Sequence, residues 1–260
     1  MKDGFIKAAA VTPKIKVADP AYNGQLIREQ IMEAHLLGAK IIVFPELCIT
    51  GYTCGDLFWH PLLLDGAKKE LLKIANFTQD LDAIVFVGLP VQCGGKLYNA
   101  AAAIADGEVL GLVPKSHLPN YNEFYERRHF TPAPEEPLTV VLGTDEDGDP
   151  IEVEMDTDQL FVCEQMPDLK IGVELCEDLF VPLKLLDIEE HRTGSVGVVG
   201  DVDLSAGELV DKPGIDGPEV ELALLRTLAR TGNVLKDPAE LSSREVCIDN
   251  KSGLFTDLVY

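Results

Sequence analysis

The sequence has little positive charge. Its 260 residues include 22 Lys and Arg against 44 Asp and Glu, which gives a formal net charge of −22 at pH 7. A field of this sign repels the phosphates of nucleic acids and the anionic surface of membranes. We therefore expect neither nucleic acid nor a membrane as a partner.

Long hydrophobic runs and patterned cysteines are also missing. No apolar stretch reaches the roughly 20 residues that span a bilayer, and the first residues lack the basic segment and apolar run of a secretory signal. The six cysteines show neither C-x-x-C spacing nor a metal-finger pattern; they are Cys48, Cys54, Cys93, Cys163, Cys176 and Cys247. Reduced thiols, no metal site and a cytoplasmic location are expected.

The sequence instead alternates buried apolar runs with amphipathic segments. Strands are expected at residues 5–11, 41–44, 83–88, 97–104, 108–113, 160–163 and 169–175, and helices at 22–37 and 62–77. Asp106 and Gly107 predict a hairpin turn between two of these strands. The order of elements indicates an α/β fold of layered sheets with helices outside.

The later part of the sequence is less regular. Residues 144–158 are acidic and rich in turn formers. A solvated hairpin is favoured there over a calcium loop, because Pro150 stands where such a loop needs glycine. Residues 219–229 carry a helical pattern within a divergent stretch. We expect a main domain at residues 1–193 and a C-terminal segment, residues 194–260, whose packing the pattern does not define.

Cys176 lies where an apolar strand gives way to the acidic residues Glu177 and Asp178. A strand that ends sharply at a helix exposes a side chain and points free N–H groups toward it, which favours a thiolate. The two carboxylates act in the opposite direction. Taken alone, Cys176 fits a buried structural cysteine better, and a nucleophilic role requires a cation from elsewhere in the chain.

Glu46 and Lys115 share this placement at the end of a buried strand. Glu46 follows residues 41–45, and Lys115 follows residues 109–114. Each has an ordinary interpretation, as an exposed loop carboxylate and as a solvated lysine. Together with Cys176, however, they provide a nucleophile, a general base and a cation for an oxyanion, which is a complete set for acyl transfer.

The three residues stand in blocks that resemble the nitrilase, or carbon–nitrogen hydrolase, superfamily. The blocks are Phe-Pro-Glu-Leu at 44–47 with Gly-Tyr at 51–52, Pro-Lys at 114–115 with Leu-Pro at 118–119, and Glu-Leu-Cys-Glu-Asp at 174–178. The resemblance implies an αββα four-layer sandwich and a Glu46–Lys115–Cys176 triad. A homo-oligomer is expected.

Longer blocks at residues 50–58, 118–130 and 176–182 resemble the glutaminase domain of glutamine-dependent NAD synthetases. This resemblance implies that Cys176 forms a thioester with glutamine, Glu46 acts as the base and Lys115 stabilises the oxyanion. The other site residues that it implies are Glu126, which supports Lys115, and Tyr121 and Glu177, which contact the substrate. It implies no cofactor for glutamine hydrolysis. ATP is expected only in a separate synthetase domain or subunit, the partner that would receive the ammonia.

The sequence departs from the NAD synthetases in two respects. Their Asn-Leu-Ser-x-Ser block, which holds glutamine and is followed by an arginine, has its nearest counterpart at residues 203–207. That stretch ends in Gly207, and the next arginine is Arg226. The chain also contains no Ser-Gly-Gly-x-Asp-Ser loop for ATP. A free-standing nitrilase-like amidase for another small amide and an inactive assembly subunit therefore stay open as alternatives.

Overall fold

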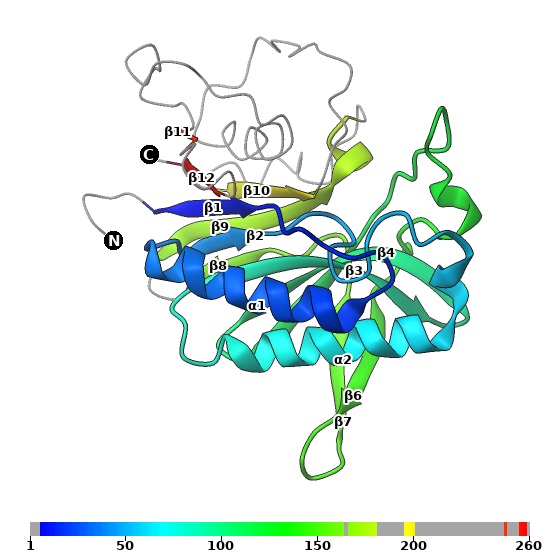
Figure 1. Ribbon diagram of the computed structural model, residues 1–260, viewed down its shortest axis with the longest axis horizontal. Helices are drawn as coiled ribbons and strands as arrows, with labels where there is room; N and C mark the ends of the chain where they lie inside the picture. The colour runs from blue at the N-terminus through cyan, green and yellow to red at the C-terminus, as the bar shows by residue number, and fades with distance from the viewer. Residues whose placement is uncertain (1–5, 164–165, 181–194, 201–246, 249–254, 259–260) are drawn as a thin grey trace.

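The computed structural model describes residues 6–163, 166–180, 195–200, 247–248 and 255–258 (Figure 1). The described chain forms two sheets and two long helices. The strands are β1 (Ala8–Val11), β2 (Ile41–Val43), β3 (Ile84–Cys93), β4 (Lys96–Ala105), β5 (Glu108–Pro114), β6 (Leu138–Thr144), β7 (Pro150–Met155), β8 (Phe161–Cys163), β9 (Met166–Leu175), β10 (Ser195–Gly200), β11 (Cys247–Ile248) and β12 (Phe255–Leu258). The helices are α1 (Pro20–Leu36) and α2 (Pro61–Phe77), and three 3₁₀ turns are η1 (Gly55–Trp59), η2 (Glu126–Arg128) and η3 (Cys176–Phe180).

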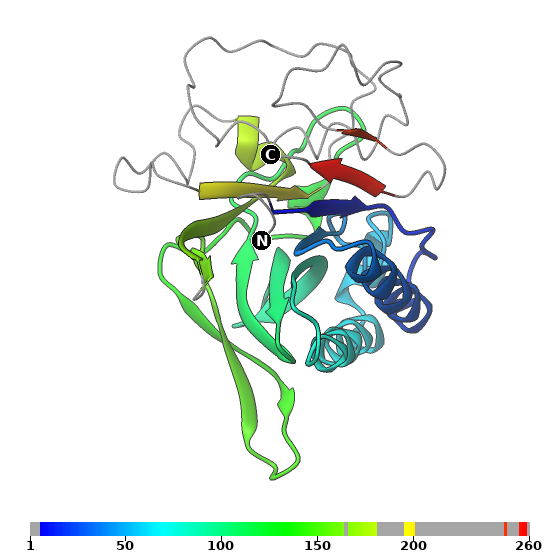
Figure 2. The same ribbon diagram turned by 90° about the vertical axis from the view of Figure 1, so that its left-hand side faces the viewer.

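The elements are stacked in layers. The large sheet has the strand order β11-β12-β1-β2-β3-β4-β5-β7-β6, and the small sheet has the order β10-β9-β8. Both helices cover one face of the large sheet, and the small sheet lies on the other side (Figures 1 and 2). One apolar cluster fills the space between helices and sheet, and a second joins the two sheets. This helix–sheet–sheet order provides three of the four layers of an αββα sandwich within the described residues.

The two long helices begin at sequence signals for helix starts. Asp19 caps α1 by accepting a hydrogen bond from Tyr22 N at 3.1 Å, and Pro20 occupies the first turn. The ring of His60 plays the same part before α2, which begins with Pro61. Both predicted helices are thus confirmed, with starts one or two residues earlier than the apolar periodicity alone indicates.

The strand directions bring distant loops to one edge of the large sheet. β1, β2 and β3 are parallel, β4 runs antiparallel to β3, and β5 runs antiparallel to β4. β2 and β5 therefore point the same way, and the residues that follow them emerge at the same edge. The predicted β4–β5 hairpin is confirmed, and Asp106 and Gly107 form its turn with φ of 50° and 86°.

Two parts of the chain differ from the sequence pattern or lie beyond what is described. The acidic hairpin is present, but its first strand, β6, begins at Leu138 and was not predicted; the hairpin projects from the body (Figures 1 and 2). From the C-terminal segment, β10 pairs with β9 and β12 pairs with β1. The expected helix at residues 219–229 and the block at 203–207 lie outside the described residues.

The described part of the chain offers neither a membrane span nor a metal cluster. None of its helices is long and apolar enough to cross a bilayer. No group of three or more His, Cys, Asp or Glu residues in that part is placed to hold a metal ion.

Candidate active site

Glu46 is held in a tight turn that crosses directly over strand β3. The next residue, Leu47, has a positive φ of 54°. A Cβ atom added to Gly88 of β3 would lie 2.2 Å from the backbone nitrogen of Leu47 and 2.9 Å from Cα of Glu46. The Gly88 carbonyl also accepts a hydrogen bond from Ile49 N at 3.2 Å. Only glycine permits this approach, so Gly88 determines where the buried Glu46 carboxylate lies.

Lys115 is the centre of the site and is 0% exposed. Its Nζ atom lies 2.8 Å from Glu46 Oε1 and 2.7 Å from Glu126 Oε1. The backbone holds the residue on both sides, because Lys115 N donates to Asn99 O at 2.8 Å and Lys115 O accepts from Ala133 N at 3.0 Å. One buried ammonium thus bridges two buried carboxylates.

The charges around Lys115 keep it protonated. Burial acts to lower the pKa of the Lys115 ammonium, but the negative charges of Glu46, Cys176 and Glu126 outweigh burial and raise it above its ordinary value. The pKa of Glu126 is raised as well. Burial, and then the charge of Glu46, raise it to about 7, although the charge of Lys115 acts to lower it. The site therefore has a permanent cation beside a carboxyl group that titrates near neutrality.

Each glutamate also receives a neutral hydrogen-bond donor. Tyr52 OH donates to Glu126 Oε1 at 2.6 Å, and Asn99 Nδ2 donates to Glu46 Oε1. Burial, followed by the charge of Glu126, raises the pKa of Tyr52, so its hydroxyl stays a donor. Neither residue was predicted from the sequence as part of the site. Tyr52 was placed in a block of family resemblance and Asn99 in a strand. The sequence feature that could have identified Asn99 as a site residue is its polar amide next to a run of buried alanines.

Cys176 is the first residue of η3, directly after β9, and is 7% exposed. Its φ of 50° lies in the left-handed region, which is uncommon for a residue with a side chain. A sharp strand-to-helix turn of this kind presents a nucleophile at the end of a sheet. The negative charge of its thiolate contributes to the raised pKa values of Lys115, Tyr52 and Tyr121, which places the sulfur in this cluster.

Asp178 fastens the cysteine turn to the loop that follows Lys115. Its buried carboxylate accepts hydrogen bonds from Ser116 N at 3.1 Å and from His117 N at 2.7 Å. The Nδ1 atom of His117 lies 2.9 Å from the same carboxylate. Burial raises the pKa of Asp178, and its bonds to His117 and Ser116 lower it in part. The contact spans about 60 residues of chain, and no local pattern signals it.

Tyr121 and Glu177 form a separate pair at the rim of the site. Tyr121 OH donates to Glu177 Oε2 at 2.9 Å, and the tyrosine is 51% exposed. The hydrogen bond to Glu177 raises the pKa of Tyr121 to about 12, with burial as the second cause. The Phe124 ring packs edge-on against Tyr121, with centroids 5.7 Å apart. The structure therefore brings Tyr121 and Glu177 to each other and leaves them accessible to a ligand.

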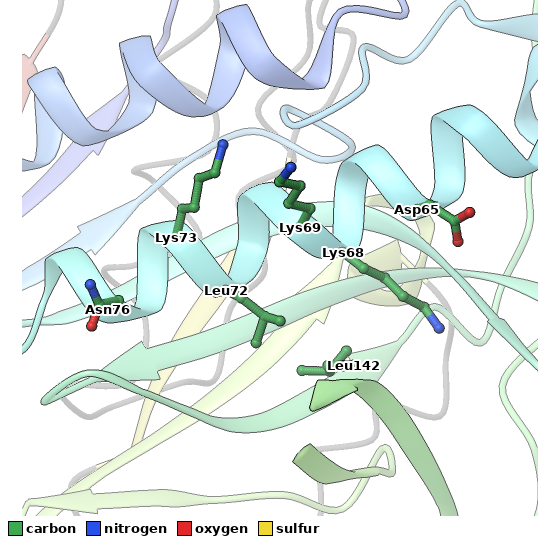
Figure 3. A pocket seen from close by; sticks show the side chains of 8 residues that line it. Asp65, Lys68, Lys69, Leu72, Lys73, Asn76 and Leu142 are labelled. Carbon is green, nitrogen blue, oxygen red and sulfur yellow. The ribbon is translucent and has the colours of Figure 1, made fainter. Parts of the chain in front are cut away.

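A shallow groove of about 490 Å³ between α2 and β6 contains none of these residues (Figure 3). Lys68, Lys69 and Lys73 project from α2 around it. Lys68 Nζ donates to the Val141 carbonyl at 3.0 Å, and Lys73 pairs with Glu70 at 2.6 Å. The groove is the solvated flank of α2 beside the edge strand β6, and no residue of the Lys115 cluster lines it.

Comparison with known proteins identifies the family. The family pattern described as carbon–nitrogen hydrolase matches residues 7–194. The chain belongs to this family. Its Glu46, Lys115 and Cys176 all lie within the matched region, and the fold is the nitrilase-type α/β sandwich.

Several curated relatives are glutamine-dependent NAD(+) synthetases. The protein from Mycobacterium tuberculosis is 38% identical over 180 residues, which cover 69% of this chain and 26% of the relative. The protein from Aquifex aeolicus is 41% identical over 177 residues, which cover 68% of this chain and 26% of the relative. The chain thus spans about a quarter of the length of these relatives.

Two of the solved structures that share the fold illustrate its range. The glutamine-dependent NAD(+) synthetase from Cytophaga hutchinsonii aligns with a TM-score of 0.61 and 28% identity over 75% of this chain and 30% of its own. An amidase from Nesterenkonia sp. aligns with a TM-score of 0.54 and 20% identity over 86% of this chain and 72% of its own. The carbon–nitrogen hydrolase fold of the chain is therefore common to glutamine-dependent synthetases and to an amidase.

Proposed function

We propose that this chain is a glutaminase-type amidohydrolase that releases ammonia from glutamine. The observation that carries the proposal is the buried Lys115 ammonium, which bridges Glu46 and Glu126 and lies within the electrostatic reach of Cys176. This is the charge arrangement that amide cleavage through a thioester requires. The names of the relatives, which are glutamine-dependent enzymes, support glutamine as the amide.

The first half of the reaction forms the thioester. Glu46 takes the proton of the Cys176 thiol, and the sulfur attacks the amide carbon. The carbonyl oxygen becomes an oxyanion, which the Lys115 ammonium stabilises. When the C–N bond breaks, Glu46 returns its proton to the departing nitrogen, and ammonia leaves.

The second half restores the enzyme. Glu46 removes a proton from water, and the resulting hydroxide attacks the thioester carbon. Lys115 again stabilises the oxyanion, and cleavage of the C–S bond releases the carboxylic acid. The proton held by Glu46 returns to the thiolate of Cys176. Glu126 supports this cycle by holding Lys115 between the two carboxylates.

The assignments at the rim complete the proposal. Tyr121 and Glu177 present a hydroxyl and a carboxylate to solvent, and these groups suit the amino and carboxamide groups of glutamine. Residues 1–193 would form the hydrolase unit. The ammonia would pass to a separate synthetase domain or subunit that uses ATP, while the hydrolysis itself needs no cofactor.

Replacement of the thiol tests the reaction. Cys176→Ala should reduce ammonia release from glutamine to background and leave the thermal unfolding curve close to that of the parent. Cys48→Ala is the matched control, because burial raises the pKa of Cys48 to about 12 and makes it an unreactive thiol. Ammonia release that persists in Cys176→Ala would contradict the proposal.

A second function is favoured by the sequence at residues 203–207, which lacks the final serine of the glutamine-binding block. A nitrilase-like amidase acting on another small amide would use the same cysteine chemistry. Rates of ammonia release from glutamine, acetamide and propionamide, measured side by side, separate the two. A higher kcat/KM for the simple amides would identify the amidase.

A further inference from the structure

Asn99 has two separate contacts with the catalytic cluster. Its side chain donates from Nδ2 to Glu46 Oε1, and its backbone carbonyl accepts from Lys115 N at 2.8 Å. The residue lies on β4 and is completely buried. It therefore touches the proposed base through its side chain and the proposed electrostatic stabiliser through its backbone.

The position of Asn99 on β4 explains how it reaches the site. Side chains alternate along a strand, so Asn99 shares a face with Ala101 and Ala103. Both alanines belong to the apolar cluster that joins the large sheet to β9. Asn99 thus projects into the space between the sheets, where β9 ends directly before Cys176. Its orientation follows from chemistry, because an ionised carboxylate only accepts hydrogen bonds and must face the NH₂ group.

Glu46 and Glu126 accept hydrogen bonds in the same pattern. Each has one oxygen bonded to the shared Lys115 ammonium and to one neutral donor: Asn99 for Glu46, and Tyr52 for Glu126. For Glu46, both bonds go to Oε1. The other oxygen, Oε2, accepts neither, so it is the atom left for proton transfer.

The placement of Asn99 also leaves one of its own atoms unsatisfied. Within the described residues, Asn99 Oδ1 is buried and has no hydrogen-bond partner. A buried polar atom without a partner is costly, on the order of 1–3 kcal/mol. A residue retained for packing alone would avoid this cost, since leucine has a similar shape and no polar atoms. The amide is therefore explained by what its NH₂ group does for Glu46.

We propose that Asn99 is a positioning residue, which holds the Glu46 carboxylate with Oε2 free to take the proton of the Cys176 thiol. This inference rests on the proposed function for the identity of the base. Asn99 acts through Glu46 and contacts no reacting atom of the substrate. A neutral donor suits this task, because it stabilises the carboxylate without competing with Lys115 for Glu126.

The test is the rate of Cys176 alkylation by iodoacetamide as a function of pH, followed by mass spectrometry of the Cys176 peptide. In Asn99→Leu, the ionised base loses a donor. The acid limb of the alkylation profile should move up by about one pH unit, so that the rate at any pH on that limb falls about tenfold. In parallel, kcat for ammonia release from glutamine should fall about 10- to 100-fold while KM changes little.

Thr78→Val is the matched control for a simple loss of structure. Thr78 is also buried and donates to the Ala75 carbonyl at 2.8 Å, but it lies at the end of α2. It should lower the melting temperature and leave the alkylation profile in place. Asn99→Ser, which is too short to reach Glu46, replaces Asn99→Leu if the leucine variant does not fold, with the same expected shift.

The outcomes separate this inference from the proposed function, because alkylation requires no amide substrate. An unchanged alkylation profile in a folded Asn99 variant overturns the positioning role, even if the parent protein hydrolyses glutamine. A shifted profile in a chain that releases no ammonia from glutamine supports the role of Asn99 and rejects the substrate.

Discussion

Lys115 has to neutralise more negative charge than it carries. Glu46, Glu126 and a Cys176 thiolate all lie within its electrostatic reach. The site reduces this excess by letting one group titrate near neutrality, and Glu126 is that group, with a pKa of about 7 that burial and the charge of Glu46 both raise. At neutral pH, Glu126 thus alternates between a carboxylate that holds Lys115 and a carboxylic acid that relieves the repulsion.

This raised pKa makes the stability of the protein depend on pH. The pKa of Glu126 is about 7 in the folded protein against an ordinary 4.5, so between these values the folded state binds the additional proton. The stabilisation from this group is therefore complete below pH 4.5 and is lost as the pH rises toward 7. In Glu126→Gln, the free energy of unfolding should decline less steeply between pH 4.5 and about 7 than in the parent.

Urea unfolding across this pH range measures the effect. Glu152→Gln is the matched control, because Glu152 is an exposed glutamate on β7 and should keep the slope of the parent. Parallel curves for the parent and Glu126→Gln would show that Glu126 does not titrate in this window.

At the scale of elements, the approach of β3 to the Glu46 turn can be tested by adding one methyl group. Gly88→Ala would bring a Cβ atom to 2.2 Å from Leu47 N, which forces the turn to move. We expect a loss of about 1–3 kcal/mol in the free energy of unfolding, together with a decrease in kcat, because Glu46 moves with the turn. Denaturant unfolding and ammonia release measure the two effects.

Gly66→Ala provides the comparison for this variant. Gly66 lies in α2, where an added Cβ would meet Pro20 Cγ at 3.4 Å, an ordinary contact. Alanine in a helix should stabilise the protein by about 0.5–1 kcal/mol and leave kcat unchanged. Equal losses in the two alanine variants would remove the special role of the Gly88 contact.

The bond between η3 and the Lys115 loop is the second element-scale test. Asp178→Ala removes the acceptor of Ser116 N and His117 N and leaves both N–H groups near a cavity. The Cys176 turn and Lys115 should then move apart, and kcat should fall at least about tenfold, as for other supporting contacts. Asp82→Ala, which removes an exposed ion pair with Lys40, should have no such effect. Parent-like turnover by Asp178→Ala would mean that the sheets alone hold the two loops together.

The sequence predicted those elements whose signals lie between residues that are neighbours in the chain. The helices were predictable because their apolar stripes and caps, such as Asp19, are neighbours in sequence. Strand β6 was missed, because its apolar run at residues 140–142 is short and stands directly before the acidic turn. The bonds of Asp178 to residues 116–117 and of Asn99 to Glu46 depend on strand order, which a single sequence does not encode in any local pattern.

At the scale of the whole molecule, the first and last strands of the described chain, β1 and β12, pair with each other. β1 has β2 on one side and β12 on the other, with register pairs from Ala8↔Leu258 to Val11↔Phe255. β1 is wholly apolar, and a strand of this kind at an open sheet edge is a site for self-association. The C-terminal segment therefore covers an edge that the expected boundary at residue 193 would leave open.

Truncation after residue 246 tests this role, because it removes β11 and β12 and leaves the Lys115 cluster intact. We expect a lower melting temperature and concentration-dependent association, measured by calorimetry and by light scattering after size exclusion. Ammonia release per folded chain should persist, since Glu46, Lys115 and Cys176 all lie before the cut. A truncated chain that stays as stable and as dispersed as the full chain would make β12 an accessory strand.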